Sequence, residues 1–243
     1  MRRKLWVALA SALAAASAGS QDRPTVYVVG TGHLDTQWLW TIQDTIREHI
    51  PKTMRVNLEA FDKHPNYVFS FEGSFRYQLM KEYYPELYAQ VKRRVAEGRW
   101  RVGGSWVDAV DVNVPSPESL IRHALYGNGF FRREFGRSSV DVFLPDCFGF
   151  GAALPTVAAH CGLKGFSTQK LTWGSAVGIP FPVGQWEGID GSRIVAALDA
   201  GSYVGDCGPD WDRANWLMEA IRKASAQGGP PVAYRYHGAG DTG

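Results

Sequence analysis

Short apolar runs alternate with longer segments of helical periodicity along most of this sequence. About seven apolar runs have the length of a strand, and most segments between them are long enough for a helix of ten or more residues. This alternation is typical of βαβ units, which give a mostly parallel sheet. We therefore predict an α/β fold, namely a seven-stranded β/α barrel-like domain with mostly parallel strands. The strands are expected near residues 26–29, 67–71, 100–103, 139–144, 165–168, 194–198 and 231–236.

Turn and capping residues indicate where the helices begin and end. Asp35 or Thr36 is placed to cap a helix after the first strand, and Ser116 followed by Pro117 is a typical start for another. Pro85 should divide a long helical stretch, because a proline inside a helix removes a backbone hydrogen bond and clashes with the preceding turn. Helices are expected at residues 75–97, 117–135, 153–160 and 211–224.

The N-terminus has the pattern of a secretory signal peptide. Residues 2–4 are basic, residues 5–15 are apolar, and Ala16-Ser17-Ala18 forms a small-residue cleavage site. We predict that residues 1–18 are a signal peptide, that residues 19–243 form the mature domain, and that the protein is secreted or periplasmic. The apolar run is too short to span a bilayer, and no cysteine follows the cleavage site to carry a lipid. No membrane anchor is therefore expected.

The composition limits the kinds of partner. Removal of residues 1–18 leaves 23 basic and 24 acidic residues, a formal net charge of −1 in place of +2. This balance argues against a nucleic-acid partner and against a basic membrane-binding surface. The three cysteines, Cys147, Cys161 and Cys207, have neither a metal-binding nor a redox spacing, and we expect them to be structural.

The segment from Gly32 to Trp38 joins the first strand to the following loop. His33 and Asp35 are two residues apart, so an extended backbone points both side chains the same way. An imidazole nitrogen and a carboxylate oxygen suit a borderline ion such as zinc. An ordinary turn histidine beside a helix-capping aspartate fits the same two residues equally well. Trp38 favours the functional interpretation, because an indole at a loop mouth is a usual platform for a sugar face.

Further carboxylates follow other predicted strands. Asp146 comes after residues 139–144, and Asp241 lies in a glycine-rich loop after the last strand. In β/α folds the chemistry gathers at the carboxyl ends of strands. Asp146 is thus a candidate nucleophile or metal ligand, or else a helix cap, and Asp241 is either functional or part of a turn. Asp108 and Asp111 are interpreted as stabilising their own loop. Two carboxylates that flank a bond are what glycoside cleavage requires.

Motifs in one fixed order extend over most of the chain. They are Gly32-His33-Leu34-Asp35-Thr36-Gln37-Trp38-Leu39-Trp40, Gly103-Gly104-Ser105-Trp106-Val107, Pro117-Glu118-Ser119-Leu120-Ile121-Arg122, Leu144-Pro145-Asp146-Cys147-Phe148-Gly149-Phe150, Ala153-Leu154-Pro155, Thr168-Gln169-Lys170-Leu171-Thr172-Trp173, Gly188-Ile189-Asp190-Gly191-Ser192 and Gly240-Asp241. In this order and spacing the sequence resembles the N-terminal catalytic domain of glycoside hydrolase family 38, the α-mannosidases. The resemblance covers nearly all of residues 25–243.

The resemblance implies a seven-stranded β/α barrel and a retaining, metal-dependent α-mannosidase that hydrolyses mannose-containing oligosaccharides. It implies a zinc ion, or another divalent metal, bound by His33, Asp35 and Asp146, with Asp146 also acting as the nucleophile. A fourth zinc ligand in the family is a histidine in a His-Asp segment well downstream. Residues 1–243 contain no such segment, so we expect the domain to be incomplete at its C-terminal end.

The resemblance also assigns the remaining site residues. Trp38 and Phe148 would line the sugar pocket, and Asp241 falls in the segment that carries the acid/base carboxylate. Two other functions fit parts of the pattern. One is a metal-dependent carbohydrate deacetylase, which needs a close pair of histidines that the sequence does not show. The other is a non-catalytic sugar-binding fragment. No pattern in the sequence indicates an oligomeric state.

Overall fold

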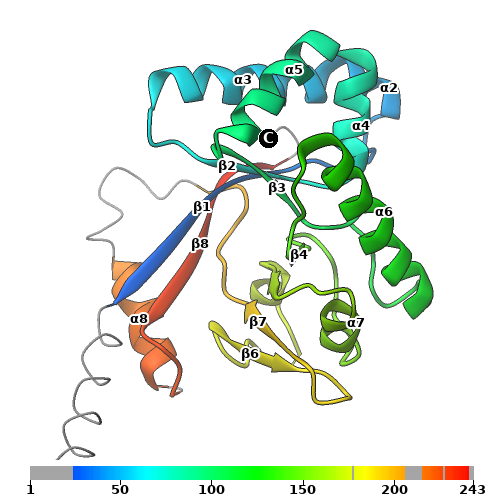
Figure 1. The fold of residues 1–243 in the computed structure, drawn as a ribbon. Helices are drawn as coiled ribbons and strands as arrows, with labels where there is room; N and C mark the ends of the chain where they lie inside the picture. The colour runs from blue at the N-terminus through cyan, green and yellow to red at the C-terminus, as the bar shows by residue number, and fades with distance from the viewer. Residues whose placement is uncertain (1–23, 177, 206–214, 227, 241–243) are drawn as a thin grey trace, which may run out of the picture.

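The computed structural model describes residues 24–176, 178–205, 215–226 and 228–240. Within these residues the chain forms two four-stranded sheets with helices packed around them (Figure 1). The predicted α/β fold with mostly parallel strands is confirmed. Closure of the strands into a single barrel stays a prediction. The signal-peptide prediction and Asp241 lie outside the described residues.

The first sheet is entirely parallel. Its strand order is β3 (Trp100–Gly103), β2 (Phe69–Glu72), β1 (Thr25–His33) and β8 (Val232–Gly240). The register aligns the carboxyl ends of the strands, because His33 pairs with Gly240 and Glu72 pairs with Gly103. Polar residues at these ends are therefore brought to one edge of the sheet.

The second sheet contains the one antiparallel pairing among the described strands. Its order is β4 (Asp141–Phe143), β5 (Gly165–Ser167), β7 (Arg193–Ala197) and β6 (Val183–Glu187). Strand β6 runs antiparallel to β7. The sequence analysis did not predict β6, because this strand is half exposed and contains a glycine and two polar residues in five positions. The other seven strands lie where they were predicted.

The helices are arranged in separate layers around the sheets. Helices α3 to α6 cover the outer side of β1, β2 and β3, α7 flanks the second sheet, and α8 packs on β8 (Figure 1). The helical bounds are α2 (Ile42–Asp44), a π-helical turn η1 (Thr45–His49), α3 (Ile50–Lys63), α4 (Ser74–Tyr83), α5 (Pro85–Ala96), α6 (Pro117–Phe135), α7 (Leu154–His160), a 3₁₀ turn η2 (Lys170–Trp173) and α8 (Asn215–Ala226). No helix of the described residues has the length and apolar character needed to cross a bilayer.

The helix starts confirm most of the capping predictions and correct one. Pro85 occupies the first turn of α5, and Ser116 accepts a hydrogen bond from the backbone N–H of Ser119 at the start of α6. The prediction that Asp35 or Thr36 caps the first helix is wrong. That helix begins at Ile42, and Thr41 caps it in a reciprocal capping box.

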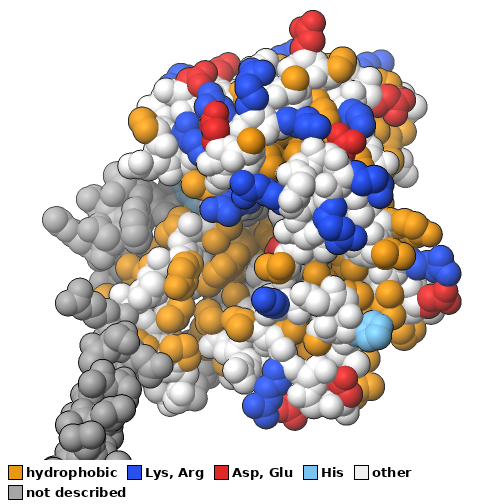
Figure 2. All heavy atoms as spheres, in the orientation of Figure 1, with side chains coloured by type: hydrophobic (Ala, Val, Ile, Leu, Met, Phe, Trp, Pro, Cys, Tyr) orange, Lys and Arg blue, Asp and Glu red, His pale blue; other side chains and the backbone are white. Residues whose placement is uncertain are grey.

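Two large apolar clusters pack against the two sheets, and two smaller ones lie next to β8. One large cluster lies between the first sheet and helices α3 to α6, and the other surrounds the second sheet and α7. Fully buried Phe71, Phe131 and Phe166 illustrate the effect, since burying such a ring stabilises the fold by about 1.5–3 kcal/mol. A cavity of about 780 Å³ lies between the sheets, lined by side chains of both. Figure 2 shows charged side chains over the helical layer and apolar ones lining the hollow below it.

Candidate functional site

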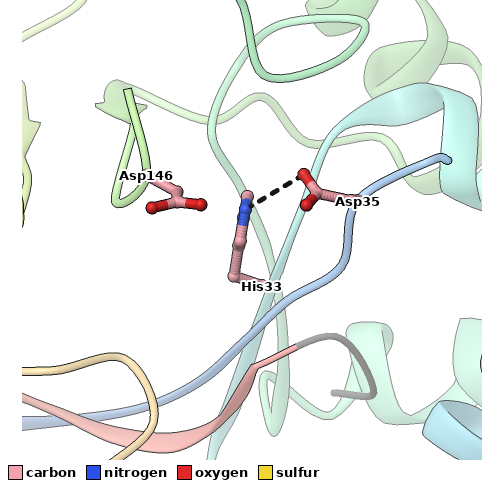
Figure 3. Close-up of side chains that lie close together, drawn as sticks. All are labelled: His33, Asp35 and Asp146. Atoms are coloured by element: carbon pink, nitrogen blue, oxygen red, sulfur yellow. Dashed lines mark ion pairs between the residues drawn. The ribbon is translucent and has the colours of Figure 1, made fainter. Parts of the chain in front are cut away.

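Three potential metal ligands converge at the carboxyl ends of β1 and β4. His33 ends β1, Asp35 lies in the loop that follows, and Asp146 lies in the loop after β4. One donor atom from each residue lies within 4.8 Å of the others. Figure 3 shows Asp35 and Asp146 approaching the ring of His33 from opposite sides. The structure thus brings together the three residues that the sequence singled out.

The ring of His33 is buried and fixed at one nitrogen. Its Nδ1 contacts Oε1 of Glu72, which ends the neighbouring strand β2. Its Nε2 lies 3.5 Å from Oδ1 of Asp35 and has no hydrogen-bond partner within the described residues. Burial by itself lowers the pKa of His33, but the neighbouring carboxylates of Glu72 and Asp35 outweigh it and raise the pKa to about 9. A buried ring with one nitrogen fixed and the other open is suited to ligating a metal.

A buried arginine contacts the residues that surround this histidine. Arg76, on α4, donates from Nε to the backbone oxygen of Leu34 at 2.6 Å, and its Nη1 lies 2.7 Å from Oδ1 of Asp108. Thr36 donates to the other oxygen of Asp108 at 2.5 Å. Burial opposes the charge of Arg76, but Asp108 and Glu72 raise its pKa above the ordinary value. Asp108 therefore stabilises the loop around it, as predicted.

The sequence analysis did not identify Glu72 or Arg76 as site residues. Glu72 could have been found from its position at the carboxyl end of a predicted strand next to β1. Arg76 was missed because Leu34 and Asp108, two of its partners, lie far away in the chain, and because Glu72, its nearby partner, lies on a strand and not on the same helix. Asp111 accepts a hydrogen bond from the backbone N–H of Asn113 at 2.9 Å, which is the loop-stabilising role expected for it.

Asp146 belongs to a second group of side chains. Its Oδ1 forms an ion pair with the buried Lys170, whose ammonium group lies 3.4 Å from the ring centroid of Trp173 and 4.5 Å from that of Phe148. Burial lowers the pKa of Lys170, and the Asp35 carboxylate opposes this shift. The interpretation of Asp146 as a helix cap is excluded, because the N-cap position of α7 is Ala153.

The predicted sugar-contacting rings are accessible. Trp38 is 63% exposed and Phe148 is 72% exposed. Neither ring is needed to fill a core, so both are free to pack against a ligand. Asp241 lies outside the described residues, and the residue before it, Gly240, pairs with His33.

The neighbouring thiol has no catalytic character. Cys147 is buried next to Asp146 in sequence, and burial raises the pKa of its thiol to about 12, so it is protonated at neutral pH. Cys147 and Cys161 are free in the part of the chain that the structure describes, and Cys207 lies outside it. The described cysteines are consistent with the structural role expected for them.

The donor set fits a divalent cation. Among the described residues, the four carboxylates of Asp35, Glu72, Asp108 and Asp146 outnumber the cations that contact them, namely Arg76, Lys170 and the protonated form of His33, which leaves an excess of negative charge. One imidazole nitrogen with two carboxylate groups is a ligand combination that zinc accepts. The buried, unpartnered Nε2 of His33 supports the same conclusion. Together the fold and the site define an α/β domain with a candidate metal centre at its strand ends.

A family model for the "Glycosyl hydrolases family 38 N-terminal domain" matches residues 23–243. The chain therefore belongs to glycoside hydrolase family 38, as the sequence resemblance predicted. It is 36% identical over 226 residues to "Alpha-mannosidase G" of Dictyostelium discoideum, covering 88% of this chain and 21% of the relative. It is 34% identical over 188 residues to human "Alpha-mannosidase 2C1", covering 77% of this chain and 18% of the relative. The chain spans about a fifth of the length of these relatives.

Solved structures show the same fold at low sequence identity. An α-mannosidase from Enterococcus faecalis V583 superposes with a TM-score of 0.71 at 19% identity, covering 90% of this chain and 25% of that one. A 4-α-glucanotransferase from Thermococcus litoralis superposes with a TM-score of 0.57 at 10% identity, covering 87% of this chain and 32% of that one. These similarities support the α/β architecture and say nothing more about the site.

Proposed function

We propose that this chain is the catalytic domain of a retaining, metal-dependent α-mannosidase that hydrolyses mannose-containing oligosaccharides. The observation that carries the proposal is the convergence of His33, Asp35 and Asp146 in a family 38 domain. These three residues would hold zinc or another divalent ion. When bound, such an ion supplies Lewis-acid contacts to oxygen atoms of the substrate.

The residues of the chain divide the chemistry between them. Asp146 attacks the anomeric carbon, so that a bond forms between its carboxylate and the sugar while the glycosidic bond breaks. Asp241 protonates the departing oxygen and then takes a proton from the water that releases mannose. The pairing of Gly240 with His33 supports placing Asp241 in this site. Lys170 forms an ion pair with one oxygen of Asp146.

The exposed rings complete the proposed pocket. Trp38 and Phe148 offer apolar faces to the sugar, which is the usual role of aromatic rings at carbohydrate sites. We also propose closure of the two sheets into one seven-stranded barrel and a secreted or periplasmic location. The location rests on the basic, apolar and small-residue pattern of residues 1–18.

Replacement of the proposed nucleophile is the decisive test. In the full-length protein, Asp146→Ala should lower hydrolysis of an aryl α-mannoside by roughly 10⁴-fold or more, as loss of a nucleophile does in other covalent mechanisms. Asp111→Ala, a carboxylate that only stabilises a turn, is the matched control and should retain activity. Unchanged activity in Asp146→Ala would reject the assignment. Release of acetate from an acetylated sugar would identify a deacetylase, and chelator-insensitive mannose binding without turnover would identify a binding fragment.

A further inference from the structure

We propose that Glu72, Arg76 and Asp108 are positioning residues that set the affinity of the candidate metal centre. The three side chains fix the ring of His33 and the backbone on both sides of Asp35. None of them belongs to the three-residue ligand group. This inference rests on the proposed function, because it assumes that the site binds a metal.

Glu72 restrains the ring of His33 through a direct contact. Glu72 is 2% exposed and reaches Nδ1 of a ring that is 1% exposed. A histidine ring that is held at Nδ1 cannot rotate freely about its χ2 torsion, so Nε2 stays directed toward Asp35. Carboxylates behind ligating histidines commonly act in this way, and removing them weakens metal binding 10- to 100-fold.

Arg76 restrains the backbone that carries Asp35. Arg76 donates to the carbonyl of Leu34, the residue before Asp35, through both Nε and Nη2. Arg76 is itself 1% exposed, and Gly73 makes room for it, because a Cβ at this left-handed position (φ 72°) would clash with its Nη1. The guanidinium group is therefore held in place by its surroundings, and its hydrogen bonds restrain the Leu34 carbonyl in turn.

Thr36, the residue after Asp35, is held by Asp108. Thr36 donates its hydroxyl proton to Oδ2 of Asp108 at 2.5 Å, while Oδ1 of Asp108 lies 2.7 Å from Nη1 of Arg76. Asp35 thus lies between two anchored residues, and its own carboxylate keeps 32% of its surface exposed. The arrangement leaves the ligand accessible while restricting its backbone.

The test compares metal affinity among variants of the purified full-length protein. Glu72→Ala should weaken Zn²⁺ binding by about 10- to 100-fold in a competition titration with a chelating dye. Glu72→Gln keeps an acceptor oxygen and should lose less Zn²⁺ affinity than Glu72→Ala. Thr36→Val should also lose less affinity, because it removes only one of the contacts that hold the backbone next to Asp35. Glu134→Gln is the matched control, since Glu134 is a partly buried carboxylate with Lys81 and Lys92 as partners on the helical side.

A second measurement separates positioning from simple loss of folding. Each variant is first checked by thermal unfolding, and Co²⁺ is then used as a spectroscopic probe of the ligand geometry. A changed visible spectrum of the Co²⁺ protein in Glu72→Gln, with the control unchanged, would support the inference even if Glu72→Ala does not fold. Wild-type affinity and an unchanged spectrum in Glu72→Gln and Thr36→Val would overturn it.

The outcomes also distinguish the inference from the proposed function. If the wild-type protein binds Zn²⁺ and the variants bind it more weakly, but no mannoside is hydrolysed, the positioning role stands and the α-mannosidase proposal fails. If the protein hydrolyses mannosides and all variants bind Zn²⁺ equally, only the positioning role fails. If the wild-type protein binds neither Zn²⁺ nor Co²⁺, both the metal centre and its positioning residues are rejected.

Discussion

The two sheets contribute to the candidate site in different ways. On the side of β1 and β2, His33 is surrounded by buried polar groups, with Glu72 and Arg76 each no more than 2% exposed. On the side of β4 and β5, Asp146 extends from a loop, keeps 23% of its side chain exposed and has one cation, Lys170, as its ion-pair partner among the described residues. The first side is a network of several linked charged groups with a buried centre, and the second side is a single ion pair.

This difference has a physical reason. A metal ligand gains affinity when its position is fixed before binding, because less conformational entropy is lost. Asp146, as the proposed nucleophile, must instead reach a substrate that enters from solvent, so its loop cannot be covered on every side. The contrast predicts that the buried charged groups around His33 respond to mutation mainly in stability, whereas the more exposed side chains of the site respond mainly in substrate handling.

The strongest test of the contrast replaces the two buried cations. Arg76→Met should lower the free energy of unfolding by about 3–5 kcal/mol, because it leaves the carboxylate of Glu72, whose side chain is only 3% exposed, without its cation. Lys170→Met should cost no more than about 1.5 kcal/mol, since Asp146 can reach water and the methionine keeps the contacts with the Trp173 ring. Chemical denaturation with urea measures both changes.

Equal losses of stability in these two variants would contradict the contrast. A loss of less than about 1 kcal/mol in Arg76→Met would show that Arg76 does not stabilise the network around His33, whatever the behaviour of Lys170→Met. Arg101→Met, which replaces an exposed arginine on β3, is the control for loss of a positive charge.

A smaller effect is expected from the exposed ring on the loop after β1. Trp38→Ala should raise the KM for an aryl α-mannoside about tenfold, because stacking of a ring on a ligand contributes about 1 kcal/mol or somewhat more. Stability should change by less than about 0.5 kcal/mol, since Trp38 is largely exposed. Leu39→Ala, at the neighbouring and more exposed position, should leave KM unchanged. An unchanged KM in Trp38→Ala would remove this ring from the proposed pocket.

The smallest effect concerns the turn of the β6–β7 hairpin. Thr156 on α7 donates a hydrogen bond to Asp190 at 2.7 Å, and with the bonds from Ser192 it lowers the pKa of Asp190 to about 2 from 3.8. Because the folded-state pKa is lowered, this stabilisation is present above pH 4 and is lost as the pH falls through about 2. The difference in thermal midpoint between wild type and Asp190→Asn should therefore shrink between pH 4 and pH 2. Thr156→Val removes the hydrogen bond from the Thr156 hydroxyl, so it should reduce the difference in thermal midpoint that Asp190→Asn causes. A difference in thermal midpoint that does not depend on pH would contradict the assignment.

Sequence patterns predicted the local structure well. Pro85 and Ser116 mark helix starts in the structure as expected, because each acts through its own φ angle or its own hydrogen bond to the adjacent turn. The cap assigned to Asp35 or Thr36 failed for a related reason. Both residues have capping side chains, but Asp35 lies against His33 and Thr36 binds Asp108, which are contacts that local propensity does not describe.

The candidate site was predicted only in part. His33, Asp35 and Asp146 were found because they follow predicted strands and lie in motifs that resemble family 38, and the structure brings them together. Glu72 was missed although it ends a predicted strand, because a glutamate there is as easily a solvated residue. Arg76 was missed because a helical pattern identifies buried positions by their apolar side chains. It gives no sign that a position with a charged side chain will be buried.

By itself the sequence predicted most of the strands and helices, the family, and the three candidate ligands, because these depend on neighbouring residues or on motifs read along the chain. Only the tertiary structure decided which polar groups meet. Glu72 and His33 are 39 residues apart, and the parallel pairing of β1 with β2 places them side by side. Whether a carboxylate serves as a cap, a ligand or a support for a ligand depends on its partners in space, and those partners are fixed only when the sheets form.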